Sequence, residues 1–183
     1  MRRAFSRQLA DAPAITVLGV VWPLVESDDT ALRLVGYELC ANHAGAMGLV
    51  RLRTLRRLAV HLTSWFDADC LGKLIMGPAW RSGQISDASI FAFAMSKNLW
   101  ARRVALVSTL GQTTSRTLRV CRMLAADREP MVWKALSWAL RDLSKRDPEA
   151  VRGFIAEHAA RLASGVVREV RNKLETGTKA GRR

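Results

Sequence analysis

The sequence is poor in proline, tyrosine and cysteine, with five, one and three copies among 183 residues. Few prolines and a surplus of Ala, Leu and Arg favour helices over a sandwich or barrel of strands. Apolar runs stay shorter than the roughly 18 residues of a membrane-spanning helix, so we expect no membrane partner. These absences predict an all-α protein.

The cysteines and histidines are spread too widely for a disulfide framework or a zinc site. Their positions are Cys40, Cys70, Cys121, His43, His61 and His158. No C-x-x-C pair occurs, and the histidines do not fall at metal-ligand spacing. We predict neither a metal nor a cofactor.

The N-terminal segment has basic residues before an apolar stretch, which is the order found in signal peptides. Asp11, Pro13 and Pro23 interrupt that stretch, and no small-x-small cleavage site follows it cleanly. We therefore expect a cytoplasmic protein, and we also expect a monomer.

Charge is the strongest compositional signal. Lys and Arg number 29 against 16 Asp and Glu, which gives a formal net charge of +13, and the isoelectric point is near 11.1. Residues 1–92 have a net charge of +2, and residues 93–183 have a net charge of +11. Such an excess is typical of nucleic-acid-binding domains, so we expect a polyanionic partner that the C-terminal half attracts.

Apolar residues recur at helical spacing along almost the whole chain and predict about ten helices. The expected ranges are 14–26, 28–43, 46–61, 64–76, 86–96, 98–110, 114–126, 130–144, 148–162 and 164–175. Short antiparallel pairs of this kind form either an α-solenoid or an irregular helical bundle. We predict one helical-repeat domain over residues 1–175 and a disordered basic tail over 176–183.

Residues at the ends of the 64–76 range give it defined limits. Ser64, three residues before Asp67, is typical of a capping box at a helix start. Gly77 as a left-handed cap and Pro78 as a helix stop are expected to end the helix. Further start and stop signals are Pro130, Asp147 before Pro148, and Gly177.

The predicted helix over 130–144 has two different faces. Its apolar stripe consists of Val132, Ala135, Leu136, Ala139, Leu140 and Leu143. The other face consists of Lys134, Trp138, Arg141 and Lys145. This face is either a solvated basic surface whose tryptophan packs on a neighbour, or a row that follows phosphates with an aromatic plate for a base or sugar.

Two carboxylates near Trp65 allow different interpretations. Asp67 lies in the first turn of its helix, where capping and the helix dipole explain it. Asp69 lies one turn after Trp65 on the same face, and Lys73 follows it by four residues. Asp69 therefore either forms a surface pair with Lys73 or is a carboxylate beside an indole in a cleft.

Arg103 lies within an apolar arc, because Leu99 precedes it by four residues and Leu106 follows by three. An arginine in such a place needs a carboxylate or phosphate partner, unless its stem is buried and its head reaches water. Asp69 is a candidate partner for Arg103.

Three segments carry recognisable motifs in a fixed order. They are SWFDADCLGKLIMGP, SKNLWARRVAL and MVWKALSWALRDLSKRDPEAVRGFI, and with their connections they span roughly residues 62–175. They contain a Trp and an Asp four residues apart, an Asn-x-Trp-x-x-Arg helix, and a Lys-Ala-x-x-Trp-x-Leu-Arg helix before an Asp-Pro turn. Together they resemble the DNA alkylation-repair family of AlkD-like glycosylases. The first segment of the chain, MRRAFSRQLADAPAITV, matches that family poorly.

The resemblance implies an α-solenoid of HEAT-like antiparallel helix pairs whose basic concave groove holds duplex DNA. It implies hydrolysis of the N-glycosidic bond of N3- or N7-alkylated (methylated) purines, in base excision repair, by an enzyme that associates with the nucleoid when bound to DNA. Asp69 matches the catalytic carboxylate of the family, and Trp65 matches its paired indole. The expected DNA and lesion contacts are Trp138, Arg103, Lys134, Arg141 and Arg102.

These residue types suit that reaction. An N-alkylated purine already carries positive charge and leaves easily, so the enzyme mainly has to stabilise an oxocarbenium-like sugar. Asp69 would stabilise that sugar and position a water, and Trp65 and Trp138 would contact the deoxyribose and the lesion through their faces. The resemblance also implies an open cleft rather than a pocket for a flipped base.

Two other functions use the same composition. A non-catalytic HEAT-like module that recognises DNA structure would bind by the same basic groove. A protein-binding scaffold would use its charge only for solubility. Release of free methylpurine distinguishes the glycosylase from both, and salt-dependent duplex binding distinguishes the last two.

Overall fold

The computed structural model describes the backbone of residues 2–181 and the side chains of residues 5–181. Every regular element in this range is a helix, so the predicted all-α class is confirmed. The chain divides into two compact units, Met1–Ser86 and Asp87–Arg183.

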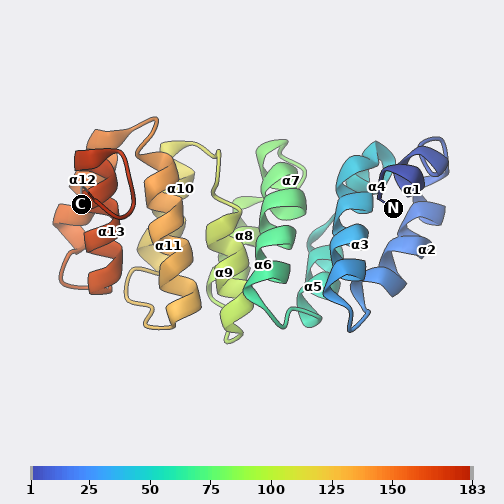
Figure 1. Ribbon diagram of the computed structural model, residues 1–183, viewed down its shortest axis with the longest axis horizontal. Helices are drawn as coiled ribbons and strands as arrows, with labels where there is room; N and C mark the ends of the chain where they lie inside the picture. Colours follow the sequence, from blue (N-terminus) through green and yellow to red (C-terminus); the bar gives the residue numbers. More distant parts are fainter. Residues whose placement is uncertain (1, 182–183) are drawn as a thin grey trace. The chain divides into compact units, whose positions relative to one another are not determined.

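The N-terminal unit is built around α3. Its helices are α1 (Arg2–Gln8), α2 (Ala14–Val25), α3 (Thr30–Asn42), α4 (Ala44–Gly48), α5 (Leu52–Val60), α6 (Trp65–Cys70), the π-helix η1 (Leu71–Met76) and α7 (Gly77–Arg81). Helix α2 packs beside α3 in the blue part of Figure 1, and α3 also contacts α1, α4, α6 and η1. The core of this unit includes Val21, Tyr37, Leu55, Ile75 and Trp80.

The C-terminal unit is built around α11. Its helices are α8 (Asp87–Ala94), α9 (Leu99–Val107), α10 (Thr114–Met123), α11 (Pro130–Leu143), α12 (Pro148–His158) and α13 (Ser164–Thr176). Helix α11 contacts α9, α10, α12 and α13, which lie around it in the yellow to red part of Figure 1. The predicted apolar stripe of α11 is confirmed, because each of its six residues is at most 1% exposed.

Several predicted helix ends are confirmed. Ser64 accepts a hydrogen bond from the Asp67 amide (3.3 Å) and starts α6. Asp147 accepts one from the Ala150 amide (3.1 Å) directly before α12. Gly177 has a φ of +75° and ends α13 in the left-handed conformation that glycine adopts without strain.

The stop predicted at Gly77 and Pro78 is wrong. Gly77 is helical, with φ −62° and ψ −50°, and the helical backbone continues to Arg81. The preceding turn is widened, so that the Gly77 amide donates to the carbonyl of Gly72, five residues earlier. A proline ring normally clashes with the carbonyl four residues before it. The π-helical turn changes that spacing and accommodates Pro78 within a continuous helical segment.

The single helix predicted over 46–61 is also wrong, because α4 and α5 are separate. The chain is extended at Arg51, with φ −136° and ψ 171°. Gln84 holds this break, since its side-chain amide donates to the carbonyls of Met47 (2.5 Å) and Val50 (2.8 Å). Thr54 accepts a hydrogen bond from the Arg51 amide (3.2 Å) and starts the new helix.

The two ends of the chain hold structure outside the predicted helices. Helix α1 lies before the first predicted range. In the basic tail, the Lys179 ammonium lies 3.2 Å from a Glu169 carboxylate oxygen, and Asn172 donates to the Lys179 carbonyl (3.1 Å). Residues 182 and 183 of the tail lie outside the described residues. The disordered tail and the single domain remain predictions.

Candidate functional site

Trp65 and Asp69 lie one turn apart on α6. Ser64 caps this helix, so the Trp65 indole stands at its first position. Trp65 is 53% exposed although tryptophan is usually buried, and its ring meets the Phe66 ring edge-on with centroids 6.1 Å apart. Asp69 is half-buried. One side of α6 therefore offers a flat apolar surface and a carboxylate.

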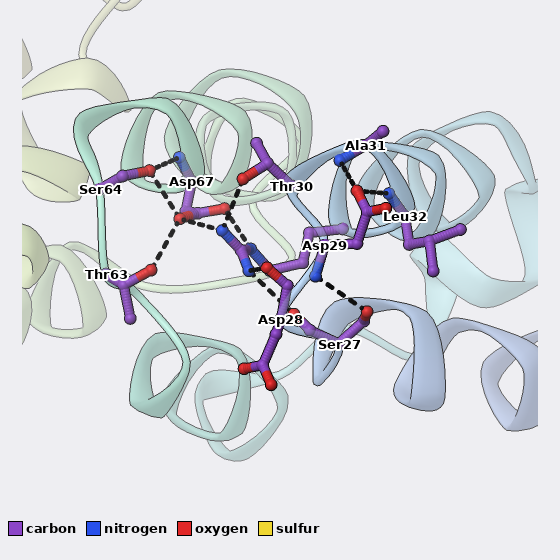
Figure 2. Close-up of polar contacts among 10 residues, drawn as sticks. Ser27, Asp28, Asp29, Thr30, Ala31, Leu32, Thr63, Ser64 and Asp67 are labelled. Carbon is purple, nitrogen blue, oxygen red and sulfur yellow. Dashed lines mark hydrogen bonds and ion pairs between the residues drawn. The ribbon is translucent and has the colours of Figure 1, made fainter.

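Asp67 lies between these residues in sequence and is fully buried. Its carboxylate accepts hydrogen bonds from Arg33 Nε (2.8 Å) and Nη2 (3.3 Å), and from the hydroxyls of Ser64 (2.7 Å) and Thr63 (3.4 Å). Figure 2 shows the two hydroxyls and the carboxylate directed at one another. The capping role predicted for Asp67 is thus only part of its function, since it also forms a buried ion pair.

Arg33, the buried partner of Asp67, is a residue beside the candidate site that the sequence pattern did not single out. Its other N–H groups donate to the carbonyls of Ser27 (2.8 Å) and Asp28 (3.0 Å) and to the Thr30 hydroxyl (3.1 Å). The hydrogen bond to Asp67 raises the pKa of the Arg33 guanidinium. The sequence spacing pointed to this position, because Tyr37 follows Arg33 by four residues and so shares its helix face. The structure buries Tyr37, so this face is the inner face of α3.

Tyr37 shows how apolar the surroundings of this ion pair are. Its side chain is fully buried, and its hydroxyl has no hydrogen-bond partner among the described residues. Burial, and secondly the charge of Asp67, raise the pKa of Tyr37. In such surroundings an ion pair with satisfied hydrogen bonds is strong and strictly directional.

Three predicted DNA contacts share one face of α11. Lys134, Trp138 and Arg141 are spaced by four and three residues; Lys134 is exposed, and the other two are half-buried. Trp133 of the same helix has a different role. A Cβ atom added at Gly165 of α13 would lie 2.8 Å from the Trp133 ring, so this ring packs closely on α13.

Arg141 also connects α11 to α13. Its Nε donates to the Ser137 hydroxyl (3.2 Å) and lies 3.9 Å from a carboxylate oxygen of Glu169. Ser137 donates to the same carboxylate (2.6 Å). The guanidinium is thereby oriented by a buried acid on the neighbouring helix.

Arg102 and Arg103 of α9 are both engaged inside the C-terminal unit. Arg102 Nε donates to Asp127 (2.6 Å), and its Nη1 donates to the carbonyls of Ser96 (3.0 Å) and Lys97 (2.9 Å). Arg103 is only 6% exposed and donates to the Met131 carbonyl (2.6 Å) at the start of α11. The structure therefore gives both arginines a role in holding α9, and their contacts with DNA remain predictions.

The basic charge is concentrated in the C-terminal unit. Residues 87–183 contain nineteen basic and nine acidic residues, against ten and seven in residues 1–86.

Within residues 2–181, no group of three or more His, Cys, Asp or Glu side chains is placed to hold a metal ion. None of the helices in that range has the length and apolar character needed to cross a membrane.

The N-terminal unit carries an exposed tryptophan beside a carboxylate on α6, and the C-terminal unit carries a basic face on α11. Each is a candidate nucleic-acid contact of an all-helical protein. The chain belongs to the family described as DNA alkylation repair enzyme, whose model matches residues 2–174. The matched range extends over the N-terminal segment as well.

A solved structure described as a predicted DNA alkylation repair enzyme from Enterococcus faecalis has the same fold. The two chains share 22% sequence identity with a TM-score of 0.77, over 96% of this chain and 85% of that chain. No curated protein matches the sequence.

Proposed function

We propose that the protein is a metal-independent DNA glycosylase that releases N3- and N7-alkylated purines from duplex DNA. Membership of the DNA alkylation repair enzyme family supports an enzyme that acts on damaged DNA. The proposal of glycosylase activity rests on the half-buried carboxylate of Asp69, one helical turn from the exposed indole of Trp65.

The main task of the protein in this reaction is to stabilise charge in the transition state. The bond between C1′ and N9 of the purine breaks, and its electron pair neutralises the positive charge that alkylation at N3 or N7 has placed on the base. The Asp69 carboxylate stabilises the positive charge that develops on the sugar. A water then adds to C1′ and loses a proton, so that the products are a free alkylpurine and an abasic site.

The aromatic and basic side chains would bind the substrate around this step. The exposed face of Trp65 suits contact with the deoxyribose or the cationic base. On α11, Lys134 would contact phosphate, Trp138 would contact the lesion, and Arg141 would contact a second phosphate from its position beside Glu169.

The test is the release of free base from methylated duplex DNA. Duplex treated with a methylating agent is incubated with the full chain, and 3-methyladenine and 7-methylguanine are measured by chromatography beside an unmethylated duplex. We expect release of methylpurine and none of normal purine, in the presence of a chelator. Tight, salt-sensitive duplex binding without release would instead show the non-catalytic DNA-binding module.

A further inference from the structure

The first observation is the opposite orientation of neighbouring side chains on α6. Successive residues of an α-helix are turned by about 100°, so Trp65 and Asp69 share one side and Asp67 points to the other. The structure agrees, since Trp65 is 53% exposed and Asp67 is 0% exposed. The buried carboxylate therefore lies directly behind the candidate active-site face.

Hydrogen bonds from three residues fix the Asp67 carboxylate. Both of its oxygens accept hydrogen bonds from Arg33, and one oxygen also accepts from Ser64 and Thr63. Arg33 comes from α3, 34 residues away in sequence, and is itself fixed to the carbonyls of the turn between α2 and α3. The start of α6 is thus fastened at its back to another part of the unit.

Stability alone does not require a charged pair at this place. Removing two charges from water is costly, and an apolar pair of similar volume often stabilises a fold as well or better. A forked guanidinium that meets both oxygens of a carboxylate adds direction, because it fixes the distance and the rotation of the helix that carries the carboxylate. Reaction rates depend on the placement of the catalytic side chains to within about 0.5 Å.

We propose that Arg33 and Asp67 are positioning residues, which set the rotation and depth of α6 so that Trp65 and Asp69 face the substrate together. This inference rests on the proposed function, because it assigns the pair to the glycosylase reaction. Neither residue touches the substrate. Their own charges cancel, so the carboxylate of Asp69 is the acid whose charge the sugar experiences.

The test is a double variant, Arg33→Met with Asp67→Leu, which replaces the pair by apolar side chains of similar volume. A matched control, Arg57→Met with Glu26→Leu, removes an ion pair between α5 and the residue that follows α2 (2.8 Å), whose side chains are 51% and 36% exposed. Three quantities are measured for each: thermal stability, the maximal single-turnover rate with its half-saturating concentration, and the NMR signal of the Trp65 indole N–H. The Trp65 signal is identified by its loss in Trp65→Phe.

For the Arg33→Met, Asp67→Leu variant we expect a folded protein whose maximal rate falls at least tenfold. Its half-saturating concentration should stay within twofold, and its Trp65 signal should move. The control should retain the rate and the signal of the wild type. If the first variant is folded and keeps both, the pair only stabilises the fold and the inference is overturned. If that variant does not fold, Arg33→Lys replaces it, since a lysine keeps the charge and loses the fork; an unchanged rate and signal there also overturns the inference.

Failure of the proposed function gives a different result. If the wild type releases no methylpurine, the glycosylase proposal falls, and the Trp65 signal alone then decides whether the pair positions α6. An unmoved signal in a folded variant overturns the inference in that case as well.

Discussion

Arg33 Nε lies 2.8 Å from Oδ1 of Asp67, and the Asp67 side chain has no exposed surface. This contact joins α3 to the start of α6, the helix that also carries the exposed Trp65 and the half-buried Asp69. The buried, ion-paired Asp67 and the two residues with a candidate chemical role thus occupy opposite sides of one short helix.

Asp67→Asn should be strongly destabilising, because it leaves the Arg33 guanidinium buried without a counter-charge. Loss of one partner of a buried ion pair costs about 3–5 kcal/mol. Glu26→Gln is the control, since its pair with Arg57 is solvent-exposed and such pairs contribute at most about 1 kcal/mol. Chemical denaturation measures the free energy of unfolding of the two variants. Equal decreases would show that the buried Arg33–Asp67 pair contributes no more than the exposed pair.

Two glycine substitutions in helices should have opposite effects. Gly165→Ala places a Cβ atom 2.8 Å from the Trp133 ring, and overpacking of this kind costs about 1–3 kcal/mol. Gly153→Ala in α12 meets no atom within 4 Å, so the better helix propensity of alanine should stabilise the protein by up to about 1 kcal/mol. Thermal denaturation is the measurement, and a stabilising Gly165→Ala would show that Trp133 is not packed on α13.

The cations predicted to contact DNA should differ in their salt dependence. Lys134 is exposed on α11, so Lys134→Ala should flatten the slope of log affinity against log salt by about one unit. The contacts of Arg102 with Asp127 and two carbonyls argue against the phosphate contact expected from the sequence. Arg102→Ala should therefore mainly lower the melting temperature and leave the slope nearly unchanged. Duplex titrations at several salt concentrations test this order, and a larger slope change for Arg102→Ala would reverse the assignment.

Asp142 on α11 should make stability depend on pH. Partial burial by itself would raise the pKa of Asp142, but hydrogen bonds from Lys145 and the Gly111 amide, with the charges of Lys145 and Arg146, lower it. A carboxyl whose pKa is lowered in the fold stabilises the protein above its unfolded pKa of about 3.9, and this contribution is lost as the pH falls through the folded value.

The variant that tests this is Asp142→Asn. It should melt earlier than the wild type at pH 7 by the equivalent of about 1 kcal/mol. The difference should shrink steadily as the pH is lowered below about 4. A difference of the same size at pH 7 and pH 3 would contradict the assignment.

Features that depend on local sequence were predicted well. The buried stripe of α11 follows from helical periodicity, and the starts of α6 and α12 follow from the side chains of Ser64 and Asp147, each of which caps within three residues. The helix stop predicted at Gly177 is another local signal, and the structure ends α13 there. These signals act over one turn of helix, so the sequence contains them directly.

Features that depend on distant residues were not predicted. The break between α4 and α5 is held by Gln84, 34 residues beyond Val50. The helix through Pro78 needs a widened π-turn, which is a property of the packed backbone rather than of one residue type. The Arg33–Asp67 pair joins positions 34 apart, and nothing in the local pattern says which acid meets which arginine.

The proposed glycosylase activity depends above all on Asp69, whose carboxylate would stabilise positive charge on the sugar during base release. Single-turnover release of 7-methylguanine from methylated duplex by wild type and Asp69→Asn, at saturating protein, tests it most directly. We expect a rate lower by about two orders of magnitude in the variant, with duplex affinity and melting temperature close to those of the wild type. An unchanged rate in a folded, DNA-binding Asp69→Asn would contradict it.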